Sequence, residues 1–525
     1  MVVSSEPHAS DAGVRVLRQG GNAIDASVAV ALALAVTHPA AGNIGGGGFM
    51  LVHLANGYAG FIDFRERAPL ASARNMYLDS AGQPTRDSSI GWRAAGVPGT
   101  VRGLELAHKR YGRLPWKLLA APAIELAEQG FPLGGSQAKS LNGSTLLAMF
   151  PESRRIFQKD GQPWSEGEVF RQPELAATLK RIASSGSADF YEGQTARALA
   201  ASMARNGGLI TLEDLRQYVA VERRPLTGTH RGYTVLTSPP PSSGGVGILQ
   251  MLAVLSATSL PKAGPGSPLS IHMAAEAMRR FFAERSEHLG DPDFARLPVA
   301  GLLDPGHIAA LRDSINPARA TPSDSLRAGA PLYEPPETTH LSVVDADGNA
   351  VSLTYTINGA FGSGVTVPGL GFLLNNEMDD FSAKPGSPNT AGLVQGEVNA
   401  IQPGKRPLSS MAPTILLRDG KPFLVLGSPG SGRIITAVLQ VILNILDFGM
   451  PLEKAVAYPR FHHQWKPDRL FLEPGFPEGT QKKLESLGHS VEITRAVGEV
   501  EAILLRDGWI EGVADPRTPG KAGGY

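Results

Sequence analysis

Asx–Gly dipeptides that separate strand-like segments constrain the fold of this chain most strongly. Asn56-Gly57 lies between apolar segments at 49–52 and 60–64, and Asp347-Gly348 and Asp419-Gly420 each separate a similar pair. Such dipeptides favour the two-residue turns of β-hairpins, because both residues tolerate the positive φ that these turns need. The chain is therefore expected to contain antiparallel sheet.

Helical segments account for much of the remaining sequence. Residues 10–18 and an apolar segment that Asn22 or Asp25 could cap are expected to be helices, as is the amphipathic segment 270–287. The pattern from 101 to about 222 is also helical, with breaks expected at Pro115, Pro122 and Pro173. Helices layered on antiparallel sheet predict an α+β fold, with an αββα arrangement.

The composition excludes several kinds of function. Lys plus Arg and Asp plus Glu both number 49, so the net charge gives no support for nucleic-acid binding or a polybasic membrane anchor. The chain has no cysteine, which excludes disulfides, thiolate metal sites and a cysteine nucleophile. The longest apolar run, 26–36, is too short to span a bilayer and is expected to be a buried helix.

The first residues, Met1 to Glu6, have neither the basic region nor the apolar region of a signal peptide. The sequence is therefore expected to be cytoplasmic or to begin after a removed leader.

Thr338 is the candidate nucleophile that the sequence indicates. It follows a proline-rich segment, 331–336, and opens a segment that alternates with the period of a strand. No Gly-x-Ser-x-Gly elbow suited to a serine hydrolase is present. If the peptide bond between Glu337 and Thr338 is broken, the new α-amine can act as the base for the hydroxyl, since it titrates near pH ~8. On position alone, an ordinary β-branched strand residue is the favoured interpretation.

Motifs elsewhere in the chain favour the interpretation of Thr338 as a nucleophile instead. The segments Asp63–Glu66, Thr338–Asp345, Leu374–Phe381, Lys405–Met411 and Pro459–Trp465 occur in this order along the chain. Together they resemble the γ-glutamyltransferase (γ-glutamyl transpeptidase) family of N-terminal-nucleophile hydrolases. The resemblance implies a four-layer αββα sandwich and self-cleavage into a large subunit, 1–337, and a small subunit, 338–525, that form one interwoven unit. It also implies a periplasmic or secreted location.

The resemblance further implies the reaction and the roles of individual residues. The expected activity is γ-glutamyl transfer and hydrolysis of glutathione and other γ-glutamyl amides, with amino acids or peptides as acceptors. Thr338 would be the nucleophile, hydrogen-bonded by Thr356. The donor's α-carboxylate would be bound by Arg65, Ser409 and Ser410, its α-ammonium by Asn358, Glu377 and Asp380, and the oxyanion by the N–H groups of Gly430 and Ser431.

Some positions depart from the family pattern or extend it. Ser431 stands where bacterial relatives usually have a second glycine, and such a substitution is strained if the position needs a positive φ. Glu377 stands where some members have Gln. The polar segment from Lys384 to Gln402 matches a lid over the donor site and favours small γ-glutamyl donors. The glycine run 45–48 is expected to allow close backbone packing.

Neither a metal nor a cofactor is expected. His462 and His463 are adjacent and would point to opposite faces of a strand, so with His340 they are interpreted as structural. Two alternatives to the transferase stay open. One is a related acylase that opens a cephalosporin or glutaryl amide, and the other is an uncleaved, inactive homologue that acts as a binding protein.

Overall fold

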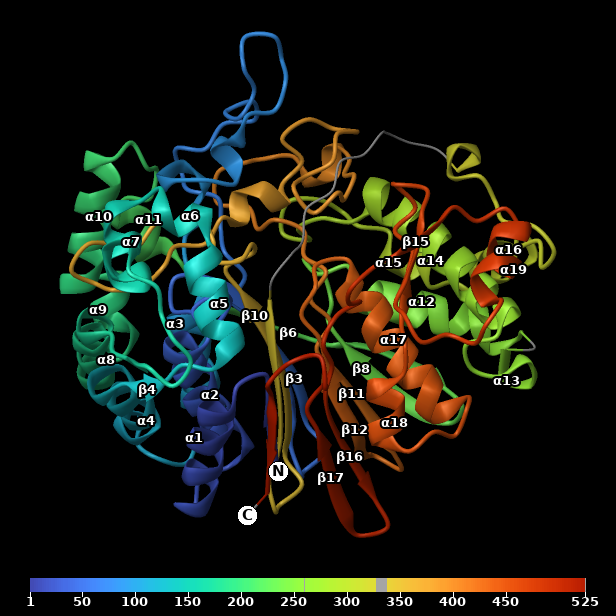
Figure 1. Cartoon of the computed structure of the whole chain (residues 1–525), viewed down its shortest axis with the longest axis horizontal. Coiled ribbons are helices and arrows are strands. Elements are labelled where there is room, and N and C mark those ends of the chain that lie inside the picture. Colours follow the sequence, from blue (N-terminus) through green and yellow to red (C-terminus); the bar gives the residue numbers. More distant parts are fainter. Residues whose placement is uncertain (259, 327–337, 525) are drawn as a thin grey trace.

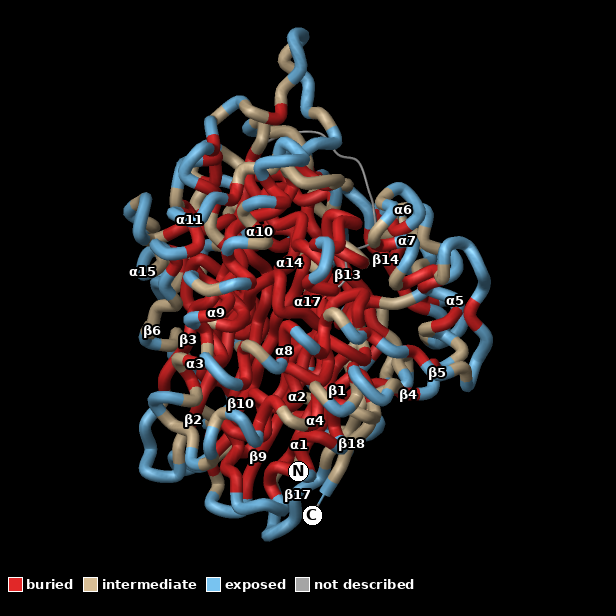
Figure 2. Tube along the Cα trace, turned by 90° about the vertical axis from the view of Figure 1, so that its left-hand side faces the viewer, coloured by how far each residue is buried: buried red, intermediate tan, exposed pale blue. Residues whose placement is uncertain are grey.

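The computed structural model describes residues 1–258, 260–326 and 338–524. Two antiparallel sheets pack face to face, and helices cover the outer face of each sheet (Figure 1). This is the expected four-layer αββα sandwich. The deepest burial follows the sheets and the helices next to them, whereas the exposed segments lie at the periphery (Figure 2).

The first sheet has seven strands and combines segments from both sides of the expected cleavage point. Its central strands, β9 and β10, are the hairpin predicted around Asp347-Gly348, and β2 and β3 are the hairpin predicted around Asn56-Gly57. Across the sheet the order is β18 (Lys521–Gly523), β1 (Val2–Ser4), β9 (Thr339–Val344), β10 (Ala350–Thr356), β2 (Gly47–His53), β3 (Ala59–Asp63) and β6 (Val221–Arg223).

The second sheet has six strands and contains the predicted hairpin around Asp419-Gly420 as β11 and β12. Its order is β17 (Trp509–Val513), β16 (Glu501–Arg506), β12 (Lys421–Gly427), β11 (Thr414–Arg418), β8 (Tyr233–Thr237) and β7 (Leu226–His230). Two smaller sheets comprise β13 (Phe461–His462), β14 (Leu470–Leu472) and β15 (Val491–Ile493), and β4 (Phe131–Pro132) and β5 (Val169–Phe170).

The helices outside the first sheet come from the first part of the chain (Figure 1). Asn22 caps α2 in a reciprocal capping box with Asp25, so both predicted cap residues contribute. The helices are α1 (Pro7–Arg18), α2 (Ala23–Thr37), α3 (Thr100–Tyr111), α4 (Trp116–Gln129), α5 (Gly135–Gly143), α6 (Thr145–Ala148), α7 (Pro151–Gln158), α8 (Pro173–Ser185), α9 (Ser187–Tyr191), α10 (Gln194–Arg205) and α11 (Leu212–Gln217).

The predicted break at Pro122 is wrong, because Pro122 lies inside α4. A proline in a helix interior removes one backbone hydrogen bond. Here α4 packs against both α2 and α8, and Pro122 itself is buried, so tertiary packing offsets that loss. Pro115 and Pro173, in contrast, stand at the beginnings of α4 and α8 as expected.

The second sheet is covered by helices from the middle and the end of the chain (Figure 1). They are α12 (Gly244–Ser256), α13 (Leu260–Ala263), α14 (Pro268–His288), α15 (Val299–Leu302), α16 (Pro305–Asp313), α17 (Arg433–Leu446), α18 (Leu452–Ala457) and α19 (Thr480–Ser486). Among the described helices, none is long and apolar enough to cross a membrane.

The two faces of β10 have different chemistry. Val351, Leu353 and Tyr355 belong to the apolar core shared with the outer helices. The alternate residues face the second sheet, where the Ser352 hydroxyl donates to the carbonyl of Leu426 on β12 at 2.9 Å. Because successive strand residues alternate between faces, every second residue of β10 and of its neighbour β9 faces the interior between the sheets.

Candidate active site

Thr338 and Thr356 lie side by side at the end of the β9–β10 pair. The register joins Thr339 to Tyr355, so its continuation by one residue sets Thr338 opposite Thr356. The Thr338 hydroxyl donates to the Thr356 hydroxyl at 3.3 Å, and the backbone N–H of Asn358 also donates to that oxygen at 2.8 Å. Both threonines are buried. Glu337, on the other side of the expected cleavage point, lies outside the described residues.

Glycines allow the backbone to pack tightly behind Thr356. Gly47 of β2 pairs with Thr356, and a Cβ added to Gly46 would lie only 2.1 Å from the carbonyl oxygen of Thr356. A Cβ at Gly47 would lie 2.6 Å from the carboxylate of Glu66. The glycine run therefore gives β2 close contact with the end of β10 and with the segment that follows β3.

His340 connects this strand end to the second sheet. Its Nδ1 lies 2.8 Å from the Thr354 hydroxyl and its Nε2 lies 3.1 Å from the Ser342 hydroxyl. Burial lowers the pKa of His340 to about 3, so the ring is neutral. A Cβ at Gly427 would lie 2.3 Å from the ring. His340 is therefore structural, and it packs on the last residue of β12.

The segment after β12 has the geometry of an anion-binding loop. Gly430 and Ser431 lie between β12 and α17 with φ of 125° and 49°. Their carbonyls accept bonds from Arg433 and Ile434 at the start of α17. Neither the N–H of Gly430 nor that of Ser431 donates a hydrogen bond to any residue that the structure describes. Two free N–H groups in one loop are suited to holding an oxyanion.

Ser431 has a positive φ, which is the condition under which a residue other than glycine is expected to be strained at this position. A residue with a Cβ is strained in the left-handed region that glycine occupies readily. The loop still presents the backbone N–H, because the substitution of a side chain leaves that group unchanged.

Arg65 lies at the centre of a buried cluster of carboxylates. It follows β3, and its guanidinium forms ion pairs with Glu377 and, at 2.5 Å, with Asp380. Glu66 lies 3.6 Å from the same guanidinium. Arg65 also donates to the carbonyls of Pro407 and Leu408 at 3.2 and 3.4 Å. The groups expected to bind opposite ends of a substrate thus contact one another in this structure.

This cluster holds more carboxylates than its own guanidinium can neutralise. Burial raises the pKa of Glu66 to about 8 and raises that of Glu377 well above its usual range, while Arg65 opposes both shifts. Within the described residues, both carboxyl oxygens of Glu66 and one of Glu377 have no hydrogen-bond partner. The cluster is therefore suited to receive an additional cationic group.

Ser409 and Ser410 lie just before β11, and each has a free hydroxyl hydrogen. The Ser409 hydroxyl accepts a bond from the N–H of Met411 at 3.1 Å, and the Ser410 hydroxyl accepts one from Arg285 at 3.2 Å. Neither hydroxyl donates to any part of the chain that the structure describes. Both hydrogens are therefore available to an anion.

Asn358 follows Thr356 by two residues, and its backbone adopts the left-handed conformation, with φ of 74°. Asparagine tolerates this conformation better than most residues. Its side chain donates to the carbonyl of Asn376 at 3.1 Å, and the Asn376 side chain accepts a bond from Gly359 at 2.9 Å. These bonds join the turn after β10 to the short 3-10 turn Glu377–Asp380.

The segment from Lys384 to Gln402 covers this turn. The Asn389 side chain donates to Asp380 at 3.1 Å, and the backbone N–H of Thr390 donates to Asp379 at 3.0 Å. On the other side, the Gln464 side chain donates to the carbonyl of Gly392 at 3.2 Å. The expected lid therefore lies directly against the Asp380 carboxylate.

No hydrogen bond among the described residues joins Gly430 or Ser431 to Thr338. The structure does bring Arg65, Glu377 and Asp380 into one cluster, and Gly47 connects it to Thr356 by pairing with Thr356 and packing against Glu66. It adds residues that the sequence analysis did not single out, above all Glu66 beside Arg65 and Arg285 behind Ser410. Glu66 could have been found as the neighbour of Arg65 in the quoted motif. Arg285 carries no such signal, because it belongs to a long amphipathic helix in which an arginine is ordinary.

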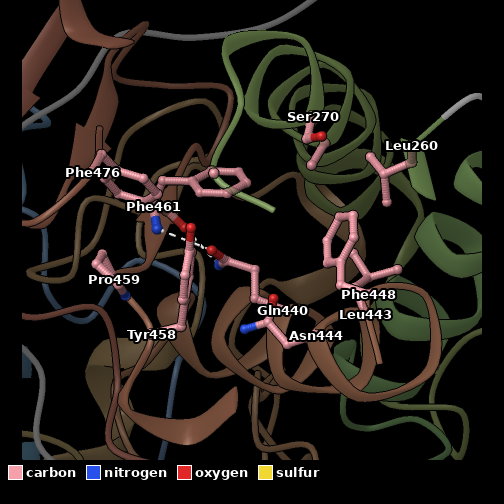
Figure 3. Close-up of a pocket in the computed structure, with 12 residues that line it drawn as sticks. Leu260, Ser270, Gln440, Leu443, Asn444, Phe448, Tyr458, Pro459, Phe461 and Phe476 are labelled. Carbon is pink, nitrogen blue, oxygen red and sulfur yellow. Dashed lines mark hydrogen bonds between the residues drawn. The ribbon is translucent and has the colours of Figure 1, made fainter. Parts of the chain in front are cut away.

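Figure 3 shows an apolar recess that is separate from this site. Its polar side chain Gln440 is already bonded to both backbone groups of Phe461, at 2.8 and 3.1 Å. None of the expected catalytic or donor-binding residues lines it. The lining residues are Leu260, Gly266, Ser270, Ala274, Gln440, Leu443, Asn444, Phe448, Tyr458, Pro459, Phe461 and Phe476.

His272, Glu276 and His489 form a buried group with metal-binding residue types. Most of their ligand atoms are already engaged, although His489 Nδ1 has no hydrogen-bond partner among the described residues. His272 Nδ1 lies 2.8 Å from His489 Nε2, and Glu276 forms ion pairs with Arg279 and Arg280. These contacts favour a structural role. The adjacent His462 and His463 bond instead to Thr436 and Asp468.

Comparisons with known proteins agree with this geometry. The family model described as Gamma-glutamyltranspeptidase matches residues 9–525. The "Glutathione hydrolase proenzyme" of Escherichia coli (strain K12) is 48% identical over 524 residues, which cover 99% of this chain and 90% of that protein.

Solved structures with the same fold include transpeptidases and an acylase. The γ-glutamyltranspeptidase of Helicobacter pylori is 45% identical with a TM-score of 0.61, covering 62% of this chain and 94% of the compared chain. The cephalosporin acylase of Bacillus halodurans is 28% identical with a TM-score of 0.87, covering 100% of this chain and 96% of the acylase chain. On the match across nearly its whole length and the relative at 48% identity, this chain belongs to the γ-glutamyltranspeptidase family.

Proposed function

We propose that this protein transfers and hydrolyses the γ-glutamyl group of glutathione and other γ-glutamyl amides, after self-cleavage between Glu337 and Thr338. The observation that carries the proposal is the position of Thr338. Its buried hydroxyl lies at a strand end and bonds to Thr356. The residue that pairs with Thr356, Gly47, packs against Glu66 of the carboxylate–guanidinium cluster around Arg65. The name of the Escherichia coli relative supports glutathione as a donor.

Cleavage creates the base that the reaction needs. The Thr338 hydroxyl attacks the carbonyl of residue 337, and the C–N bond of that peptide breaks, which gives an ester and frees the α-amine of Thr338. Water then hydrolyses the ester, which releases the carboxyl group of residue 337 and restores the Thr338 hydroxyl. In the mature enzyme that amine takes the proton from the Thr338 hydroxyl as it attacks the γ-carbonyl of the donor. Thr356 orients the nucleophile in both reactions through the hydrogen bond between the two hydroxyls.

The negative oxygen formed by this attack requires donors already in place. The free N–H groups of Gly430 and Ser431 are the proposed donors. When the intermediate collapses, the α-ammonium of Thr338 gives its proton to the leaving amine, which is cysteinylglycine when glutathione is the donor. Water, or the amine of an amino acid or peptide, then attacks the γ-glutamyl ester and regenerates the Thr338 hydroxyl.

Donor recognition is assigned to complementary charges. The α-carboxylate binds Arg65 and the free hydroxyl hydrogens of Ser409 and Ser410. The α-ammonium binds Asn358, Glu377 and Asp380, and carboxylates are the usual partners of a buried cation. Since Arg65 is paired with Glu377 and Asp380 in this structure, donor binding exchanges contacts within the cluster for contacts with the two ends of the donor.

The proposal extends to assembly and location. The products of cleavage are a large subunit, 1–337, and a small subunit, 338–525, which remain together because strands of both form the same sheets. A periplasmic or secreted location is proposed on family analogy.

The first experiment is denaturing mass spectrometry of the protein after incubation at neutral pH. Fragments of residues 1–337 and 338–525 are expected, and Thr338→Ala should leave the 55.3 kDa chain intact. A wild-type chain that stays intact would favour the inactive homologue. The matured enzyme is then given γ-glutamyl-p-nitroanilide and glutaryl-p-nitroanilide, which differ only in the α-amino group. Preference for the glutaryl substrate would favour the acylase that the Bacillus halodurans neighbour exemplifies.

A further inference from the structure

Arg285 on α14 is a buried arginine that reaches the donor site through serine hydroxyls. Its side chain is 2% exposed. Its Nε donates to the Ser243 hydroxyl at 2.9 Å, and Ser243 in turn donates to the carbonyl of Ser409 at 2.7 Å. Its Nη2 donates to the Ser410 hydroxyl at 3.2 Å. Arg285 therefore holds the segment that presents both donor-site serines.

The charge of Arg285 has no carboxylate partner within the described ranges of the chain. No Asp or Glu oxygen there lies within 4.0 Å of its guanidinium. Other fully buried arginines do have such partners: Arg65, Arg279 and Arg460 each form an ion pair. A buried guanidinium without a counter-ion is costly, which indicates that a ligand supplies the missing charge.

The charged residues near Arg285 indicate where a negatively charged ligand group would bind. Burial lowers the pKa of Arg285 to about 10, so it stays a cation at neutral pH. Asp380 favours the charged form and Arg65 opposes it, so Arg285 lies within the field of the donor cluster. Arg65 is already neutralised by Glu377 and Asp380, whereas Arg285 is not.

The bond to Ser410 also determines what that hydroxyl can do. Because Ser410 accepts a hydrogen bond from a cation, its own hydrogen is free to be donated, and the positive charge makes it a stronger donor. An anion on the far side of Ser410 would therefore gain both a hydrogen bond and a nearby positive charge.

We propose that Arg285 is a positioning residue that binds the donor's α-carboxylate through Ser410 and compensates its charge. This inference rests on the proposed γ-glutamyl activity and extends it to a residue on α14 outside the motifs that indicate the family.

The test compares two donors in the matured enzyme, γ-glutamyl-p-nitroanilide and 4-aminobutyryl-p-nitroanilide, which lacks only the α-carboxylate. Arg285→Met should raise KM for the first donor by roughly 10- to 100-fold, the effect of losing a hydrogen bond to a charged group, with a smaller change in kcat. It should leave kcat/KM for the second donor nearly unchanged. Arg285→Lys keeps the charge and should recover part of the lost affinity.

Arg280→Lys is the matched control, since Arg280 is also buried on α14 but pairs with Glu276. It should leave the ratio between the two donors at the wild-type value. The inference is overturned if Arg285→Met lowers turnover of both donors equally. It is also overturned if both Arg285 variants fail to mature while Arg280→Lys matures, because Arg285 would then serve the fold. A wild-type enzyme without γ-glutamyl turnover would instead reject the proposed function itself.

Discussion

The hydroxyl oxygens of Thr338 and Thr356 lie 3.3 Å apart, across a hairpin that separates the two residues by 18 positions. This distance is longer than the usual 2.5–3.0 Å range of hydroxyl–hydroxyl bonds (about 2.7 Å is typical), and catalytic bonds of this kind often shorten when substrate is bound. The hairpin register and the close packing of Gly46 against Thr356 hold the pair in place.

Loss of the Thr356 hydroxyl should slow both self-cleavage and turnover. Thr356→Val keeps the shape of the side chain but cannot bond to the nucleophile, so kcat should fall by roughly 10²-fold, the lower end of what a positioned proton-transfer partner contributes. Thr356→Ser keeps a hydroxyl and should retain most of the activity. Cleavage half-times from gel electrophoresis and kcat for γ-glutamyl-p-nitroanilide measure the two effects. Equal rates for the valine and serine variants would contradict this role.

Ser431→Gly should stabilise the protein without loss of activity. Ser431 has a φ of 49°, and relief of strain at such a position contributes about 1 kcal/mol. The backbone N–H proposed for the oxyanion is retained, so kcat should stay within a few-fold of wild type. Ser431→Pro lacks the N–H and also forces φ to about −65°, so it should lose activity for both reasons. Thermal unfolding and steady-state kinetics give the two readouts, and a lower Tm for the glycine variant would contradict the strain argument.

Glu501 should make the protein less stable as the pH rises. It is fully buried, and neither carboxyl oxygen has a hydrogen-bond partner in the part of the chain that the structure describes. Burial, with Asp515 and Glu499 nearby, raises its pKa well above the usual value of 4.5. The folded state therefore binds a proton that the unfolded state releases above pH 4.5, and stability falls as the pH rises from there towards the folded-state pKa.

Glu501→Gln removes this titration. Its Tm should exceed that of wild type by a few degrees at pH 8, since burying an unpaired charged group costs at least ~1–3 kcal/mol. Near pH 4.5 the two proteins should be much closer in Tm. Differential scanning calorimetry at several pH values tests this, and a difference in Tm that does not depend on pH would count against it.

The contact between the lid and Asp380 should affect donor affinity. Asn389→Ala removes a 3.1 Å hydrogen bond to Asp380 and should raise KM several-fold, with little change in kcat. Asn389→Asp introduces a second negative charge beside Asp380 and should have a larger effect, which salt reduces. Steady-state kinetics at low and high ionic strength distinguish the variants. No change in KM for either one would show that the lid contact does not contribute to donor binding.

Local sequence patterns determined the positions of three hairpins, the cap of α2 and the candidate nucleophile. Asn56-Gly57, Asp347-Gly348 and Asp419-Gly420 specified the hairpins because positive-φ turns have strong residue preferences. The α2 cap followed from Asn22 and Asp25 for a similar local reason. The choice of Thr338 as the candidate nucleophile followed from the absence of cysteine and of a serine elbow, together with the motifs that resemble the family.

Tertiary structure alone decided which charged groups meet. The pair of Arg65 with Glu377 joins residues 312 positions apart, and Arg285 reaches Ser410 from a helix 125 positions away. Such contacts depend on how the sheets stack and where α14 crosses them, which no local pattern encodes. Pro122 shows the same effect in the backbone, because packing against α2 and α8 keeps α4 continuous through a residue that favours a break.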